Sequence, residues 1–220
     1  MEDSVAAWKR ILELELVKDT SGLTVEDIMR AAGELYTEVT RFRDESMIEF
    51  GWQSFDRLLF ETLGISFKLG YAELEKEFWD TLYQYTPADG IFDVLDTLEK
   101  NGIKTGIISN TGYTGGLLEE ELARHNLAHR FSFLIASADY GFRKPHRRIF
   151  QVAVKKMNLK PQEIWFVGDN LEYDVKGAID YGLYPVWYNA RNEPGKPDYE
   201  YLEVSDWYAF KDKIESLCNR

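Results

Sequence analysis

Apolar residues recur at helical spacing through the first 86 residues, and this pattern predicts a set of amphipathic helices. We expect a first helix from a cap at Asp3 or Ser4 to about Leu16. A second should follow Thr24-Val25-Glu26-Asp27, which resembles a capping box. Two more are predicted over 54–63 and 71–85. Together these four helices predict a small helical module.

From Gly90 onward, short apolar segments alternate with amphipathic ones. The pattern predicts strands over 103–108, 133–136, 164–167 and 184–188, and helices over 91–101, 116–125, 145–157, 173–181 and 207–217. The strands are apolar throughout, as in a parallel sheet that is covered on both faces. Repeated β-α-β units predict a doubly wound, Rossmann-like α/β domain, in which ligands bind at the carboxyl ends of the strands.

Composition and charge exclude several classes of protein. The 220 residues include 26 Lys+Arg and 38 Asp+Glu, for a net charge of −12. Such a chain repels nucleic acid and anionic membranes, so we expect neither as a partner. No apolar run nears the ~18 residues of a membrane span, and the N-terminus lacks the apolar region of a secretory signal. The single Cys218 rules out an internal disulfide framework. We expect a soluble, cytoplasmic protein, either monomer or homodimer.

Polar motifs follow the predicted strands. Ser109-Asn110-Thr111 offers a hydroxyl, an amide and backbone N–H groups, which suit an anion cradle or an ordinary polar turn. The segment 141–148 is the densest positive patch of this acidic chain. Its cations stand at a helix start, where the macrodipole disfavours them, so it indicates either function or a solvated loop.

Carboxylates follow the strand predicted over 164–167. Asp169 stands at the strand end, and Asp174 lies five residues later, so that both can face one site. Hard oxygen ligands of this kind suit Mg²⁺. The alternative is a helix cap with an acidic first turn.

The hydroxyl, the lysine and the carboxylate pair, in this order, resemble the haloacid dehalogenase (HAD) superfamily, most of whose members are Mg²⁺-dependent phosphatases. Residues 107–111 resemble its second motif, Lys144-Pro145 its third, and residues 167–174 its fourth. The resemblance implies an α/β HAD core domain over 87–220. It also implies an inserted all-α cap domain over 1–86, which covers the site and selects substrates.

The resemblance also implies a role for each matching residue. Ser109 would bind a phosphoryl oxygen with help from Asn110, and Lys144 would neutralise negative charge. Asp169 would hold Mg²⁺, and Asp174 would support the metal directly or through another ligand. The implied activity is Mg²⁺-dependent hydrolysis of a small phosphorylated metabolite.

The family's first motif, an apolar strand ending in Asp-x-Asp that supplies the nucleophile and the general acid/base, is not readable here. The one internal candidate nucleophile is Asp19, after the alternating segment Leu12–Val17. As a central strand this segment would bury two glutamates, and Ser21 would be a weak proton donor. We therefore expect the sequence to begin downstream of that strand. Either Leu12–Val17 fills its place, or the sheet is short.

Two other functions stay open. The first is a phosphate- or partner-binding derivative of the family that has lost the nucleophile and has no activity. The second is the metal-free dehalogenase branch of the family, against which the intact Gly168-Asp169 argues.

Overall fold

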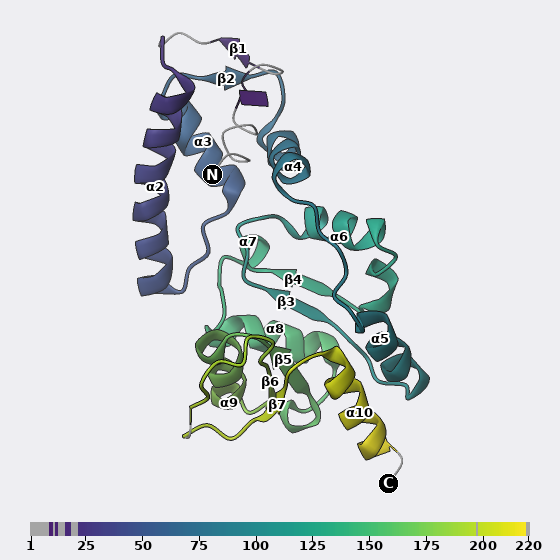
Figure 1. Ribbon diagram of the computed structural model, residues 1–220. Helices are drawn as coiled ribbons and strands as arrows, with labels where there is room; N and C mark the ends of the chain where they lie inside the picture. Colours follow the sequence, from purple (N-terminus) through teal and green to yellow (C-terminus); the bar gives the residue numbers. More distant parts are fainter. Residues whose placement is uncertain (1–8, 11, 13–15, 19–21, 197, 219–220) are drawn as a thin grey trace.

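The computed structural model describes residues 9–10, 12, 16–18, 22–196 and 198–218, which form an α/β fold (Figure 1). The elements in chain order are β1 Leu16–Lys18, α2 Val25–Ser46, α3 Trp52–Thr62, β2 Ser66–Phe67, α4 Tyr71–Leu82, α5 Ile91–Lys100, β3 Ile107–Ser109, α6 Gly115–Arg124, η1 Ala128–Arg130, β4 Leu134–Ala136, α7 Ser137–Tyr140, α8 Arg147–Met157, η2 Pro161–Glu163, β5 Trp165–Gly168, η3 Leu171–Lys176, α9 Gly177–Tyr181, β6 Tyr184–Tyr188, β7 Leu202–Val204 and α10 Trp207–Cys218. None of the helices in the described ranges has the length and apolar character needed to span a membrane.

The helices α2, α3 and α4 form a helical part at one end of the molecule (Figure 1). Their buried faces share one hydrophobic cluster, which includes Ile28, Leu59, Phe60 and Leu74. The predicted capping box is confirmed, because Thr24 Oγ1 accepts a hydrogen bond from the backbone N–H of Asp27 and the Asp27 carboxylate accepts one from that of Thr24. The helix therefore begins where its sequence predicts.

The chain before α2 differs from the expectation. Residues 9–10 and 12 are helical, but Leu16 belongs to β1, which pairs antiparallel with β2 in the helical part. The predicted first helix therefore does not extend to Leu16. Asp3, Ser4 and Asp19 lie outside the described residues.

The α/β part contains two parallel sheets instead of the single predicted one. β3 pairs with β4, and β5, β6 and β7 form a second sheet in that order. Ile108 of β3 and Phe166 of β5 pack against one cluster built around Ile149 and Phe150 of α8. On the opposite face, α5 and α10 cover the β5–β6–β7 sheet. Both sheets thus share the layer formed by α8.

The division of the sheet falls between β3 and β5. Within the described ranges, each of these strands pairs on one side only. Every residue of β3 and of β5 is half-buried, whereas Ile135 in β4 and Val186 in β6 have no exposed surface. Because Leu16 and Val17 pair in the helical part, they do not fill the place of a central strand, and the second expectation, a short sheet, holds.

Several element bounds differ from the sequence pattern. β3 covers only the last residues of the predicted strand over 103–108, and α8 begins at Arg147, after Pro145. The helix predicted over 173–181 begins earlier as a π-helical turn at Leu171 and continues as α9. The short strand β7 and the one-turn helix α7 were not predicted.

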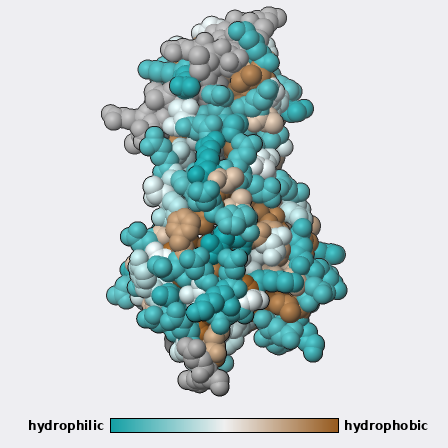
Figure 2. Space-filling model, turned by 90° about the vertical axis from the view of Figure 1, so that its right-hand side faces the viewer, coloured by the Kyte–Doolittle hydropathy of each residue, from teal (hydrophilic) through white to brown (hydrophobic). Residues whose placement is uncertain are grey.

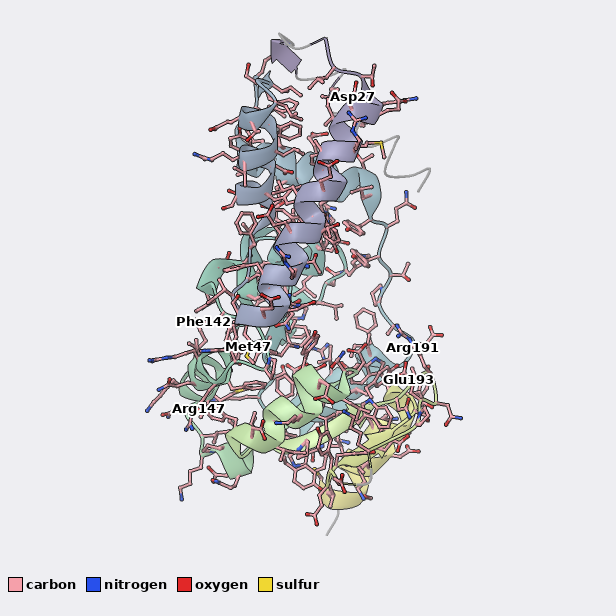
Figure 3. The ribbon with its side chains drawn as sticks, turned by 90° about the vertical axis from the view of Figure 1, so that its left-hand side faces the viewer. Asp27, Met47, Phe142, Arg147, Arg191 and Glu193 are labelled. Atoms are coloured by element: carbon pink, nitrogen blue, oxygen red, sulfur yellow. The ribbon has the colours of Figure 1, made fainter. Side chains whose placement is uncertain are left out.

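A segment between α2 and α3 joins the helical part to the α/β part. Met47 accepts a hydrogen bond from the backbone N–H of Arg143 (3.1 Å), and Trp52 N donates to Gly112 O (2.8 Å). Figure 3 shows Met47 at the end of α2 beside Phe142, with Asp27 at the far end of the helix. The elongated outline in Figure 2 follows from this end-on arrangement.

Candidate functional site

Lys144 is held at the carboxyl ends of β3 and β5. Its Nζ lies 2.7 Å from Asp174 Oδ1 and donates to the carbonyl oxygen of Ile108 at 3.1 Å. The Lys144 and Asp174 side chains are 11% and 5% exposed, so this ion pair is largely withdrawn from water. A buried charge pair of this kind is costly to break, because the remaining charge loses its partner. The lysine is therefore fixed between the two strand ends.

Asn110 positions the main chain of Lys144. Its Nδ2 donates to Lys144 O (2.9 Å), and its Oδ1 accepts from Lys144 N (2.7 Å). The side-chain amide is thus engaged on both sides, and its predicted contact with phosphate stays a prediction. Ser109 precedes it as the last residue of β3 and is half-buried.

Asp169 and Asp174 have different surroundings. Asp174 is buried, and its Oδ2 accepts from the backbone N–H of Asn170 (3.0 Å). Asp169 is exposed directly after β5, and its backbone carbonyl accepts from Trp187 Nε1 (3.0 Å). A Cβ on Gly168 would stand 2.4 Å from Asp174 Cβ, so this position requires glycine for the carboxylate to reach Lys144. The two carboxylates are close in sequence but are used differently.

A buried network that sequence reasoning missed supports the loops around the site. Ser137, the first residue of α7, donates its hydroxyl hydrogen bond to Glu49 Oε2 (2.8 Å) and accepts one from Thr111 N (2.8 Å). The Glu49 carboxylate also lies 3.4 Å from Arg43 Nη1 and 3.8 Å from Arg143 Nε. The one available signal was a single acidic residue flanked by Ile48 and Phe50.

The helical part meets the α/β part through α4 and α6. Glu75 of α4 accepts hydrogen bonds from the backbone N–H and the hydroxyl of Thr114, the residue before α6 (2.9 Å each). The rings of Trp52, Trp79 and Tyr113 pack together beside this contact. Burial, and then the negative charge of Glu75, raises the pKa of Asp56 to about 7. The interface thus contains a carboxyl group that titrates near neutral pH.

A cavity of about 400 Å³ opens beside Asp169 at the carboxyl ends of β5 and β6. Its wall includes Tyr188 and Trp207, whose rings stack 4.7 Å apart. Arg191 and Glu193 line the outer side, and Figure 3 shows them together on one loop. The exposed carboxylate of Asp169 therefore borders an open space.

The predicted residues form a connected set, although only part of it meets directly. Hydrogen bonds and one ion pair link Asn110, Lys144 and Asp174, while Ser109 and Asp169 adjoin this set along the chain. The described residues hold no cluster of three or more His, Cys, Asp or Glu side chains arranged for a metal ion. Mg²⁺, however, commonly needs only one or two carboxylates, with water and substrate oxygens completing its shell. The exposed Asp169 fits that requirement.

An α/β core whose polar residues gather at the strand ends, joined to a helical part, defines a hydrolase-like class, and sequence comparison identifies the family. The profile of the haloacid dehalogenase-like hydrolases matches residues 12–187. The chain belongs to this family.

Individual relatives agree with this assignment. The chain is 36% identical over 120 residues to the glyceraldehyde 3-phosphate phosphatase of Pyrococcus furiosus, a match that covers 54% of this chain and 48% of that protein. The chain thus spans about half the length of this curated relative. Two solved structures share the fold. A HAD phosphatase from Thermococcus onnurineus has a TM-score of 0.67 at 23% identity (96% of this chain, 87% of that one). A 2-haloacid dehalogenase from Pseudomonas syringae pv. Tomato DC3000 has a TM-score of 0.69 at 19% identity (98% and 90%).

Proposed function

We propose that this protein is a phosphomonoesterase that acts with Mg²⁺ on a small phosphorylated metabolite. The observation that carries the proposal is the position of Lys144, whose ammonium group is fixed between the ends of β3 and β5 by Ile108 and Asp174. A positioned cation at this edge of a parallel sheet suits the phosphoryl group, since phosphoryl transfer depends on orientation and charge stabilisation. The phosphatase among the relatives supports the same substrate class.

Each residue has one task in this proposal. Lys144 neutralises charge on the phosphoryl group, and Ser109 donates its hydroxyl hydrogen bond to a phosphoryl oxygen. Asn110 keeps the Lys144 main chain in place. Asp174 keeps the lysine side chain in place. Asp169 is the residue that would hold Mg²⁺, which supplies further positive charge next to the phosphoryl oxygens when bound.

The test is hydrolysis of an aryl phosphate by this chain with Mg²⁺ and with EDTA. We expect turnover with Mg²⁺ only, and its loss in Asp169→Asn. Asp212→Asn, at an exposed position of α10, is the matched control and should keep full activity. An Asp19→Asn sample examines the candidate nucleophile suggested by the sequence. Turnover that is unaffected by EDTA and by Asp169→Asn would contradict the proposal.

A second candidate is a phosphate-binding protein of the same family that lacks turnover. It is favoured by one observation: β3 and β5 are each paired on one side only in the described part of the chain, right beside Lys144. Phosphate binding by a folded sample that hydrolyses no aryl phosphate would select this candidate over the first.

A further inference from the structure

The main chain of β3 presents hydrogen-bonding groups on its unpaired side. Ile107 N donates to Phe133 O, so the N–H and C=O groups of Ile107 point toward β4. Along a parallel strand these groups alternate in direction from residue to residue. The groups of Gly106 and Ile108 therefore point away from β4. The contact between Ile108 O and Lys144 Nζ agrees with this direction.

β5 is arranged in the same way. Ile164 O accepts from Tyr184 N, so this carbonyl points toward β6. By alternation, the N–H and C=O groups of Trp165 and Val167 point away from β6. Neither strand has a pairing partner on these sides within the described residues. Unpaired N–H and C=O groups on a half-buried strand are a template for another strand.

The two open edges belong to one binding site. Lys144 Nζ joins Ile108 of β3 to Asp174, which follows β5, so the carboxyl ends of the two strands lie at the same place. The same ammonium group lies 5.5 Å from the ring of Phe166. Both strands also pack against the cluster around Phe150. The strands consequently run in the same direction with their open edges on the inner sides.

The side chains on both faces of this place are apolar. Ile108 and Phe166 contribute to the cluster beneath α8, while Trp165 and Val167 contribute to the cluster beneath α5 and α10. A strand between β3 and β5 would place alternate side chains against these two clusters. A strand buried on both faces of a parallel sheet is apolar at every position.

We propose that the open edges of β3 and β5 form a receptor site for one extended, apolar peptide strand that runs parallel to both. The occupant is recognised by its main chain, through Gly106, Ile108, Trp165 and Val167, and by valine- or isoleucine-like side chains on both faces. The site depends on sheet geometry and needs no turnover, so it stands or falls separately from the phosphatase proposal.

The experiment measures binding of a fluorescein-labelled peptide with five consecutive valine and isoleucine residues behind a lysine-rich solubilising tail. The full chain should bind it saturably. The same peptide with proline at its central position should not bind, because proline removes a main-chain donor. Equal binding of both peptides would overturn the proposal, as would absence of saturable binding.

Two variants at one position separate main-chain pairing from side-chain packing. Val167→Pro removes an N–H on the open side of β5 and leaves the pairing with β6 intact, so the fold should persist. We expect this variant to bind the peptide at least about tenfold more weakly. Val167→Ala keeps the N–H and should bind within about threefold of the unmodified chain, which is less than one hydrogen bond is worth. Equal affinities for the two variants would contradict strand pairing.

Hydrogen exchange of the unmodified chain provides a reading that does not depend on any variant. Peptide binding should slow amide exchange at Ile108, Trp165 and Val167 beyond any change in α2 or α10. Protection confined to other segments would overturn the proposal. So would sedimentation showing that the edges are already taken by a second copy of the chain, which the peptide fails to displace.

Discussion

At the scale of single residues, the buried ion pair between Lys144 and Asp174 organises the candidate site. Removing one member of such a pair leaves an uncompensated charge in a region closed to water. We expect Lys144→Met to lower the free energy of unfolding by about 3 kcal/mol. The double variant Lys144→Met/Asp174→Asn should lose clearly less than the sum of the two single losses. Urea unfolding of the three variants measures this, and strictly additive losses would show that the two groups do not interact.

Asp56 is the second residue whose environment has a measurable consequence. Its ordinary pKa is 3.8, and burial together with the charge of Glu75 raises the pKa to about 7. Between these values the folded protein holds a proton that the unfolded chain releases, so this residue makes stability fall as pH rises from about 4 to 7 and leaves it constant above that. In Asp56→Asn this contribution is removed.

The expected difference between Asp56→Asn and the unmodified protein therefore grows with pH. The variant should gain stability at a rate approaching about 1.4 kcal/mol per pH unit over this range and then level off. Thermal unfolding at several pH values measures the gain, with the exposed Asp212→Asn as a control that should show no such trend. A pH-independent difference would mean that Asp56 is ionised in the folded protein at pH 5.

At the scale of elements, Gly168 links β5 to the π-helical turn η3. A Cβ here would meet Asp174 at 2.4 Å, and the carboxylate would have to move away from Lys144. We expect Gly168→Ala to lower stability by about 1–3 kcal/mol, as overpacking does. Gly116→Ala is the matched control, because a Cβ there meets nothing within 4 Å in a helix that favours alanine. Equal melting temperatures for the two variants would contradict the close contact.

The elements themselves were largely predictable, because most buried faces repeat with a helical or strand period. The helix α2 began where its capping box predicted, and β6 had the bounds that its apolar run indicated. The short strand β7 lacked a sufficiently long pattern. The division between β3 and β5 depends on pairing between distant segments, so the sequence could predict a short sheet only through the family's missing first motif.

The candidate site was predictable as a set of residues and less so as a geometry. Ser109, Lys144 and Asp169 were found because strand ends in parallel sheets carry ligand-binding residues. The ion pair of Lys144 with Asp174 spans thirty positions of sequence, and no local pattern reveals it. The contribution of Glu49 was missed for the same reason, since its partners Ser137 and Arg143 come from a distant segment.

At the scale of the whole molecule, Glu49 joins the helical part to the α/β part. Glu49→Ala would leave Arg43 and Arg143 without their buried partner, so we expect a loss of about 3–5 kcal/mol. The loss should appear first as faster hydrogen exchange in residues 47–52, the segment between α2 and α3. Ser137→Ala removes a single hydrogen bond to the same carboxylate and should cost about 1 kcal/mol. Uniform destabilisation without local exchange in this segment would contradict the linking role.

The central claim is that a phosphoryl group and Mg²⁺ share the site formed by Lys144 and Asp169. The most direct measurement is calorimetric titration of the full chain with inorganic phosphate, with and without Mg²⁺, for the unmodified protein and Asp169→Asn. We predict that Mg²⁺ tightens phosphate binding in the unmodified protein and has no effect on it in the variant, which should remain folded. Phosphate binding that Mg²⁺ does not alter, or that responds equally in both proteins, would contradict the shared site.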